Sequence, residues 1–296
     1  MSLHKKKEIT GHSGAVYCCI SDGHYIYTGS ADKYVTRWRI EEGIQDEFAI
    51  KFKYSIYALC VTNDEFLVVG LASGGLHFFD LKSRQELKFY TQHTQAIFSI
   101  AYNSIKKHIY ATDADGNLSV WSSDGSKLLI YLPLDCGKVR SIDVVSDGSH
   151  FVLACQDGTI RIFESEYFNE IVTIDGHKGG ATSVLFHPLN TDQLITGGKD
   201  ALLKLWNWRS GDELNSIVAH TFAVYAIVSI NDGQTIITAS RDKHVKEWTS
   251  SLDIVKRLDR KSGGHEHSVN DLCVVDKQTV VSCSDDKRII LWELKG

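Results

Sequence analysis

The sequence predicts an all-β protein in which seven four-stranded antiparallel sheets form a closed ring. An aromatic residue recurs along the chain, at Trp38, Phe79, Trp121, Phe163, Trp206, Trp248 and Trp292. Subtracting neighbouring numbers gives intervals of 41, 42, 42, 43, 42 and 44 residues. A period of this size indicates one repeated structural unit, and seven such units account for the 296 residues. We therefore expect a single domain over residues 1–296.

Each unit contains four short strand-like segments, and unit 5 shows them best. Its expected strands are 181–186, 193–197, 202–206 and 213–218. Tight turns roughly every 8–12 residues favour antiparallel neighbours. One such sheet has two faces to cover. Stacking the sheets around a ring covers both faces and leaves only short edges.

The amino-terminal segment of the chain can supply the strand that the last unit lacks. The chain stops at Gly296, just after the third strand of unit 7, so that unit lacks a fourth strand. Residues 5–10 precede Gly11-His12, at the place where a fourth strand would lie. We expect this segment to pair with unit 7 and to fasten the ring.

Composition narrows the function classes. The net charge of −5 gives no support to a general nucleic-acid or membrane-surface binder. The seven cysteines form no C-x-x-C pair, which argues against a disulfide scaffold or a zinc site and suits a reducing compartment. No apolar run approaches about 18 residues, and the amino terminus lacks the apolar core of a signal peptide. The expected location is cytoplasmic, with the nucleus not excluded.

Several units begin with Gly-His, turn at an Asp and end on a Trp. Three units show all of these features: Gly11-His12, Asp32 and Trp38; Gly176-His177, Asp200 and Trp206; Gly264-His265, Asp286 and Trp292. In this the chain resembles the WD-repeat (WD40) β-propeller family over nearly its whole length. Units 2 and 4 depart most: Phe52, Ser73 and Phe79 replace His, Asp and Trp in unit 2, and Asp135 and Phe163 replace His and Trp in unit 4.

Four units hold a His, a hydroxyl, an Asp and a Trp at matching offsets. The four sets are His12, Thr28, Asp32 and Trp38; His177, Thr196, Asp200 and Trp206; His220, Thr238, Asp242 and Trp248; and His265, Ser282, Asp286 and Trp292. A hydroxyl, an imidazole and a carboxylate also make up a nucleophilic triad. Four copies favour a structural role, in which the chain of hydrogen bonds satisfies buried polar groups. The resemblance implies that these are the structural tetrads of the family. Unit 3 keeps His93, Asp115 and Trp121 but has Ala111 at the hydroxyl position, so we expect its chain to be interrupted.

The resemblance also implies where partners dock. The family's contact positions lie three and five residues after the His and one residue before the turn Asp, at the mouth of the channel. The residues of interest at these positions are Tyr17, Tyr57, Phe98, Lys138, Arg140, Lys199, Tyr225 and Arg241. Aromatics and arginine dominate binding hot spots, and clustered cations favour an anionic partner. Alternatively, these residues are ordinary rim residues, with the tyrosines packed between sheets.

The sequence therefore predicts a monomeric, non-catalytic scaffold that binds a peptide or protein, acidic or phosphorylated, at the channel mouth. No cofactor and no metal are expected, because His265 of the His265-Glu266-His267 tripeptide is already used by the repeat. One alternative is a propeller enzyme with a loop-based active site. Another, less favoured, is a nucleic-acid-associated adaptor.

Overall fold

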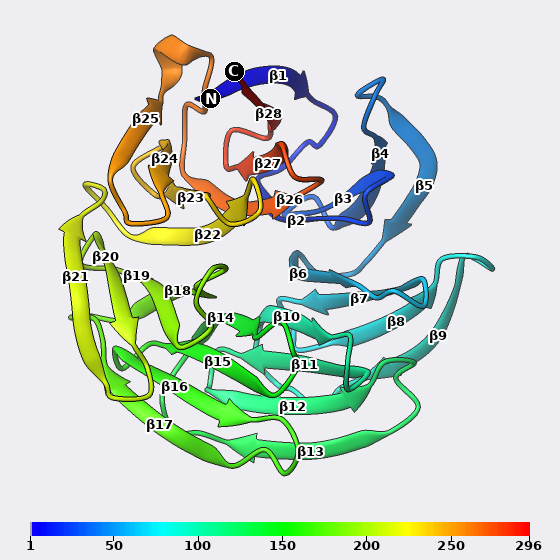
Figure 1. Ribbon diagram of the computed structural model, residues 1–296. Helices are drawn as coiled ribbons and strands as arrows, with labels where there is room; N and C mark the ends of the chain where they lie inside the picture. Colours follow the sequence, from blue (N-terminus) through cyan, green and yellow to red (C-terminus); the bar gives the residue numbers. More distant parts are fainter. Residues whose placement is uncertain (1) are drawn as a thin grey trace.

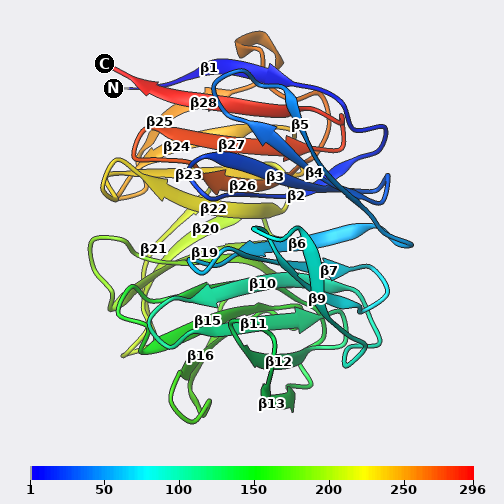
Figure 2. The same ribbon diagram turned by 90° about the vertical axis from the view of Figure 1, so that its right-hand side faces the viewer.

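The computed structural model describes residues 2–296 and shows a ring of seven four-stranded antiparallel sheets, here called blades 1 to 7 (Figures 1 and 2). Blade 1 has the strand order β2-β3-β4-β5, and blades 2 to 6 continue in the same way. Blade 7 has the order β1-β28-β27-β26, so its outermost strand comes from the amino terminus. The predicted seven-bladed fold and its closure by an amino-terminal strand are both confirmed.

The strands have the following bounds. Blades 1 and 2 contain β2 (Val16–Ser21), β3 (Tyr25–Ser30), β4 (Tyr34–Arg39), β5 (Gln45–Lys51), β6 (Ile56–Val61), β7 (Phe66–Leu71), β8 (Leu76–Asp80) and β9 (Gln85–Tyr90). Blades 3 and 4 contain β10 (Ile97–Asn103), β11 (His108–Asp113), β12 (Asn117–Ser122), β13 (Leu128–Pro133), β14 (Val139–Val144), β15 (His150–Cys155), β16 (Thr159–Glu164) and β17 (Glu170–Asp175). Blades 5 and 6 contain β18 (Ala181–Phe186), β19 (Gln193–Gly198), β20 (Leu202–Asn207), β21 (Asp212–Val218), β22 (Val224–Ile230), β23 (Thr235–Ser240), β24 (Val245–Thr249) and β25 (Ile254–Leu258). Blade 7 contains β26 (Val269–Val274), β27 (Thr279–Ser284), β28 (Ile289–Lys295) and β1 (Ser2–Ile9), and a short 3-10 helix, η1 (Arg260–Ser262), precedes it.

The position of a strand within its blade explains its residue pattern. The second strand of each blade is covered on both sides by neighbouring blades, and β19 reads as a continuous apolar and small-residue run with almost every position buried. The outermost strand β21 is mostly exposed and polar. The hydrophobic core is divided between blades: Tyr27 and Val35 of blade 1, for example, pack with Leu67 and Val69 of blade 2. Each blade therefore needs its two neighbours to bury its faces.

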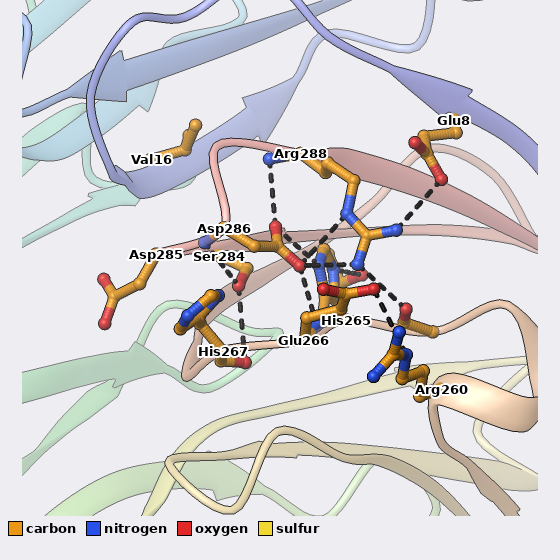
Figure 3. A network of polar contacts seen from close by, with 12 residues as sticks. Glu8, Val16, Arg260, His265, Glu266, His267, Ser284, Asp285, Asp286 and Arg288 are labelled. Carbon is orange, nitrogen blue, oxygen red and sulfur yellow. Dashed lines mark hydrogen bonds and ion pairs between the residues drawn. The ribbon is translucent and has the colours of Figure 1, made fainter.

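Strand β1 closes the ring and extends further toward the amino terminus than predicted. It runs over Ser2–Ile9 rather than 5–10, and its pairing with β28 extends from Ser2↔Lys295 to Ile9↔Ile289. A salt bridge of 3.3 Å joins Glu8 to Arg288, which also donates to Asp286 of the blade 7 tetrad (Figure 3). The closing strand is thus tied to the last blade by side chains as well as by the backbone ladder.

The four predicted tetrads form hydrogen-bonded chains. In blade 1 the Trp38 indole N–H donates to Thr28 Oγ1 over 2.7 Å, His12 Nε2 lies 2.8 Å from the same oxygen, and His12 Nδ1 lies 2.8 Å from Asp32 Oδ2. Blades 5, 6 and 7 repeat this geometry with distances of 2.8 to 3.2 Å. Because the carboxylate only accepts, His Nδ1 donates to Asp and the hydroxyl donates to Nε2.

The expectation that blade 3 has an interrupted chain is wrong. His93 Nε2 lies 2.7 Å from Ser119 Oγ, the Trp121 indole N–H donates to the same oxygen over 2.8 Å, and His93 Nδ1 lies 2.7 Å from Asp113, not Asp115. Ser119 is the cross-strand partner of Ala111 in the β11–β12 ladder. The hydroxyl has therefore moved to the opposite strand, where it reaches the same space.

Blades 2 and 4 replace the tetrad by different means. In blade 2, Phe52 packs edge-on against His77 and Phe79, with ring centroids 5.0 and 5.9 Å away, so an aromatic cluster takes the place of the polar chain. In blade 4, Arg161 donates to the backbone oxygen of Leu134 and to Asp157, over 2.9 and 3.0 Å. An arginine thus connects the opening loop to the turn Asp, as His does elsewhere.

Two further features concern the cysteines and the helices. All seven cysteines are free and buried. No helix within residues 2–296 is long and apolar enough to cross a bilayer.

Candidate functional site

The channel at the centre of the ring is lined by the first strand of each blade, and each of these strands contains a β-bulge near its start. In β2 the register shifts between Val16 and Cys18, and in β14 it shifts between Val139 and Ser141. The other five first strands shift at the same place. The bulged residues are Tyr17, Tyr57, Phe98, Arg140, Thr182, Tyr225 and Asn270. A bulge leaves one residue outside the ladder and re-aims its side chain. Six of these seven side chains line the channel, whereas Thr182 is buried and donates to the backbone oxygen of Gly197 over 3.2 Å.

Three of the predicted aromatics form a continuous row across blades 1 to 3. Tyr17 packs edge-on against Tyr57 with ring centroids 4.9 Å apart, and Tyr57 stacks on Phe98 at 5.1 Å. All three line a cavity of about 700 Å³ in the channel. The row presents apolar area on rigid side chains, which suits an apolar anchor of a ligand.

Arg140 of blade 4 continues this row on a charged side chain. Its guanidinium carbon lies 5.2 Å from the Phe98 ring centroid and 4.9 Å from that of Tyr225, so it sits between two aromatic faces. Within residues 2–296 it makes no salt bridge. Burial lowers the pKa of Arg140, although a guanidinium stays charged at any pH of interest. A partly desolvated cation without an acidic partner carries an energetic cost, and an anionic ligand group would compensate that cost.

The remaining predicted cations lie at different depths. Arg241 lines the channel cavity at its exposed rim, together with Tyr225. Lys138 and Lys199 do not line the cavity. Lys138 instead places its ammonium 4.3 Å from the Phe98 ring centroid, and its pKa is lowered by burial and by the nearby charges of Arg140 and Lys199. The predicted set is therefore a core of six lining residues with two lysines outside it.

Acidic side chains also line the cavity. Asp285 accepts from the side-chain amide of Asn270 over 2.8 Å. Asp143 accepts from Phe186 N over 2.6 Å, and Asp271 accepts from Cys19 N over 3.0 Å. Burial raises the pKa of Asp143 to about 6 and that of Asp271 to about 7. The cavity is thus divided, with cations on blades 4 and 6 and carboxylates on blades 4 and 7.

Two exposed aromatics beside the mouth were missed by the sequence reasoning. Phe222 is 55% exposed and Tyr54 is 42% exposed. The Arg241 guanidinium lies 5.9 Å from the Phe222 ring centroid. Both stand two residues after the His position of their unit, occupied by His220 and Phe52. Reading that position in every unit would have found them.

The tetrads do not form an active site, since their hydroxyls are inaccessible. Thr28, Thr196, Thr238 and Ser282 are fully buried and already bonded to His and Trp. Burial lowers the pKa of His12, His177 and His220. Burial alone would raise the pKa of Asp242, but the hydrogen bond from His220 and those from backbone N–H groups hold it well below its usual range. Among residues 2–296 no group of three His, Cys, Asp or Glu side chains is placed to hold a metal.

The chain is similar to several proteins of known sequence. It is 26% identical over 215 residues to the U3 small nucleolar RNA-associated protein 15 homolog of Gallus gallus, an alignment that covers 69% of this chain and 40% of that protein. It is 24% identical over 275 residues to striatin of Rattus norvegicus, covering 88% of this chain and 31% of striatin. It is 24% identical over 299 residues to an uncharacterised WD repeat-containing protein of Schizosaccharomyces pombe, covering 98% of this chain and 69% of that protein. The chain thus spans well under half the length of the first two.

The family profile described as "WD domain, G-beta repeat" matches six stretches of the chain. These are residues 4–39, 84–122, 130–164, 168–207, 211–249 and 256–293, which together make up most of the sequence. Residues 40–83, which hold β5 of blade 1, the first three strands of blade 2 and the cluster of Phe52, His77 and Phe79, fall between the first two matches. Proteins of this family are typically protein-interaction scaffolds and generally non-catalytic. The fold, the tetrads and the repeat matches agree, and the chain belongs to the WD-repeat β-propeller family.

Proposed function

We propose that this protein is a non-catalytic scaffold that binds an anionic peptide segment of a protein partner at the channel mouth. The observation that carries the proposal is Arg140, a half-buried cation between Phe98 and Tyr225 that makes no salt bridge within residues 2–296. An acidic or phosphorylated side chain would supply the missing counter-charge with two hydrogen bonds. The similarity to striatin and to the U3 small nucleolar RNA-associated protein 15 homolog is consistent with a protein as the partner.

The aromatic row and the exposed rim of the channel would contact different parts of the peptide. Tyr17, Tyr57 and Phe98 offer an apolar platform beside Arg140, and Arg241 with Phe222 offers a second cation beside an exposed aromatic ring. A peptide with an apolar side chain next to an acidic group would contact both. Because the cations are part of the contact, the affinity should fall as salt rises.

The test is a quantitative affinity capture from cell lysate with the Arg140→Glu, Arg241→Glu variant. The matched control is the Arg39→Glu, Arg84→Glu variant, which makes the same charge change at two exposed arginines away from the cavity. Proteins retained by wild type and by the control should be lost from the first variant, and acidic synthetic peptides derived from them should bind wild type. Identical capture by all three proteins would refute the proposal.

A further inference from the structure

A second cavity of about 700 Å³ lies between blades 6 and 7 and shares no lining residue with the channel. Two loops line this open pocket. The β23–β24 turn contributes Lys243 and His244, and the long β25–β26 loop contributes the rest of the lining, namely Asp259, Arg260, Lys261, His265, Glu266 and His267. We call this cavity the blade 6–7 pocket.

The β25–β26 loop departs from the repeat. The interval from Trp248 to Trp292 is the largest of the six, and the loop folds back as η1, which ends at Gly263 with a positive φ of 76°. Asp259 accepts from the backbone N–H of Lys261 and Ser262, over 2.9 and 3.2 Å. These bonds give the loop a defined shape, so Lys261 is presented at the pocket by an ordered turn.

Both acidic side chains of the pocket are already engaged. Asp259 caps η1 and also pairs with Arg257 over 3.0 Å. Glu266 pairs with Arg260 over 3.3 Å, as Figure 3 shows for the two facing side chains. Neither carboxylate pairs with the remaining cations of the pocket.

The remaining cations have no acceptor of their own. Within residues 2–296, neither Lys243 nor Lys261 makes an ion pair or a side-chain hydrogen bond, and the His267 ring makes none either. Asp242, the neighbour of Lys243, is not available as an ion-pair partner for it. Its carboxylate oxygens already accept from His220 Nδ1, Thr221 N and His244 N over 2.9 to 3.1 Å. The pocket therefore holds two ammonium groups and an imidazole that lack intramolecular acceptors.

We propose that the blade 6–7 pocket binds the phosphoryl group of a phosphorylated side chain on a protein partner. A phosphoryl group carries close to two negative charges and three acceptor oxygens, which match two ammonium groups and one ring N–H. The cavity is large enough to hold the whole modified side chain. A nucleic acid fits less well, because it requires a wide basic stripe and this protein has a net charge of −5.

The short β23–β24 turn connects the pocket to the channel mouth. Arg241 lines the channel and Lys243 lines the pocket, and they flank the fixed Asp242. An extended peptide advances about 3.3 Å per residue, so a phosphorylated residue a few positions from a group held at the mouth would reach the pocket. The pocket is a separate site and does not depend on the channel for its binding chemistry.

The test is an NMR titration of the isotope-labelled protein with O-phosphoserine, with serine as the matched ligand control. Phosphoserine should shift the amide signals of Lys243, Lys261 and His267 saturably, and serine should not. The Lys243→Ala, Lys261→Ala variant should bind at least tenfold more weakly. Lys33→Ala is the matched control, because Lys33 follows the turn Asp of blade 1 at a φ of 74°, like Lys243 at 76°, but lines neither the channel cavity nor the blade 6–7 pocket.

Each outcome decides the proposal. An absence of saturable shifts, or an equal loss in Lys33→Ala, would overturn it, as would a DNA oligonucleotide that shifts the same amides at lower concentration than phosphoserine. If the double variant does not fold, Lys261→Ala alone, on the exposed loop, gives the same comparison. Arg140→Glu should leave the phosphoserine-induced shifts of Lys243, Lys261 and His267 unchanged, so failure of the channel-mouth proposal and failure of the pocket proposal are distinguishable.

Discussion

The rebuilt tetrad of blade 3 makes a quantitative prediction. Ser119→Ala removes the oxygen that accepts from Trp121 and bonds to His93 Nε2, and all three residues are at most 2% exposed. Among residues 2–296 no other acceptor is bonded to the Trp121 indole N–H. A buried donor left without a partner costs about 1–3 kcal/mol, and two groups lose their partner here. We therefore expect the free energy of unfolding to fall by about 2–6 kcal/mol, measured by urea denaturation.

Blade 1 supplies the control. Thr36 stands two residues before Trp38, as Ser119 stands two residues before Trp121, and its hydroxyl lies 2.9 Å from His12 Nε2. Thr36→Ala leaves Thr28 in place to accept from Trp38 and to bond with His12. Only redundant hydrogen bonds are lost, so the expected cost is about 0.5–1.5 kcal/mol.

A second change separates the hydrogen bond from other effects of Ser119→Ala. Ala111 faces Ser119 across the ladder, at the position where the other tetrads carry their hydroxyl. Adding Ala111→Ser to Ser119→Ala should recover part of the lost stability, because the hydroxyl returns to the same space. Equal losses for Ser119→Ala and Thr36→Ala, together with no recovery, would refute this account of blade 3.

Two further predictions concern closure and pH. Deleting residues 1–10 exposes the β28 edge, so the truncated protein should aggregate or melt lower; a monomer in light scattering with an unchanged melting temperature would contradict the closure. Burial raises the pKa of Asp271 from 3.8 to about 7, so its protonated form contributes stability that is present below about pH 3.8 and is lost as pH rises through about 7. Asp271→Asn keeps an acceptor for Cys19 N and should gain stability relative to wild type between pH 5 and pH 8 in urea denaturation. A constant difference between the two proteins over that range would show that Asp271 does not titrate in this way.

The period of the aromatics and the turn residues were sufficient to predict the ring and its closure. In unit 5 each predicted strand agrees with the structure to within one residue at either end. This success has a physical cause: a middle strand buried on both faces must be apolar throughout, and the outermost strand must not be. The start of β1 at Ser2 was missed because an edge strand rich in lysine carries no such signal.

The site was less predictable. Offsets along one strand could not show that Ser119 replaces Ala111, because the two are related by pairing across the ladder and not by sequence spacing. Sequence offsets also could not separate Lys138 and Lys199 from the six residues that line the cavity. Whether a side chain reaches the cavity depends on the β-bulges, which the offsets do not show. The only sign of the blade 6–7 pocket in the sequence was the slightly longer interval between Trp248 and Trp292. The pocket itself could not be predicted, because two separate loops must meet in space to form it.

The antiparallel pairing of β1 with β28 has a mechanical consequence. Ser2 faces Lys295, so both chain ends leave the ring at one point. Tension between them would load the ladder one residue pair at a time, as in a zipper, and not all pairs together as in shear. The second pair would resist most, because Leu3 N donates to Glu247 over 2.9 Å and Leu3 O accepts from Lys256 over 2.6 Å. In a pulling experiment blade 7 is therefore the seam at which this ring opens first.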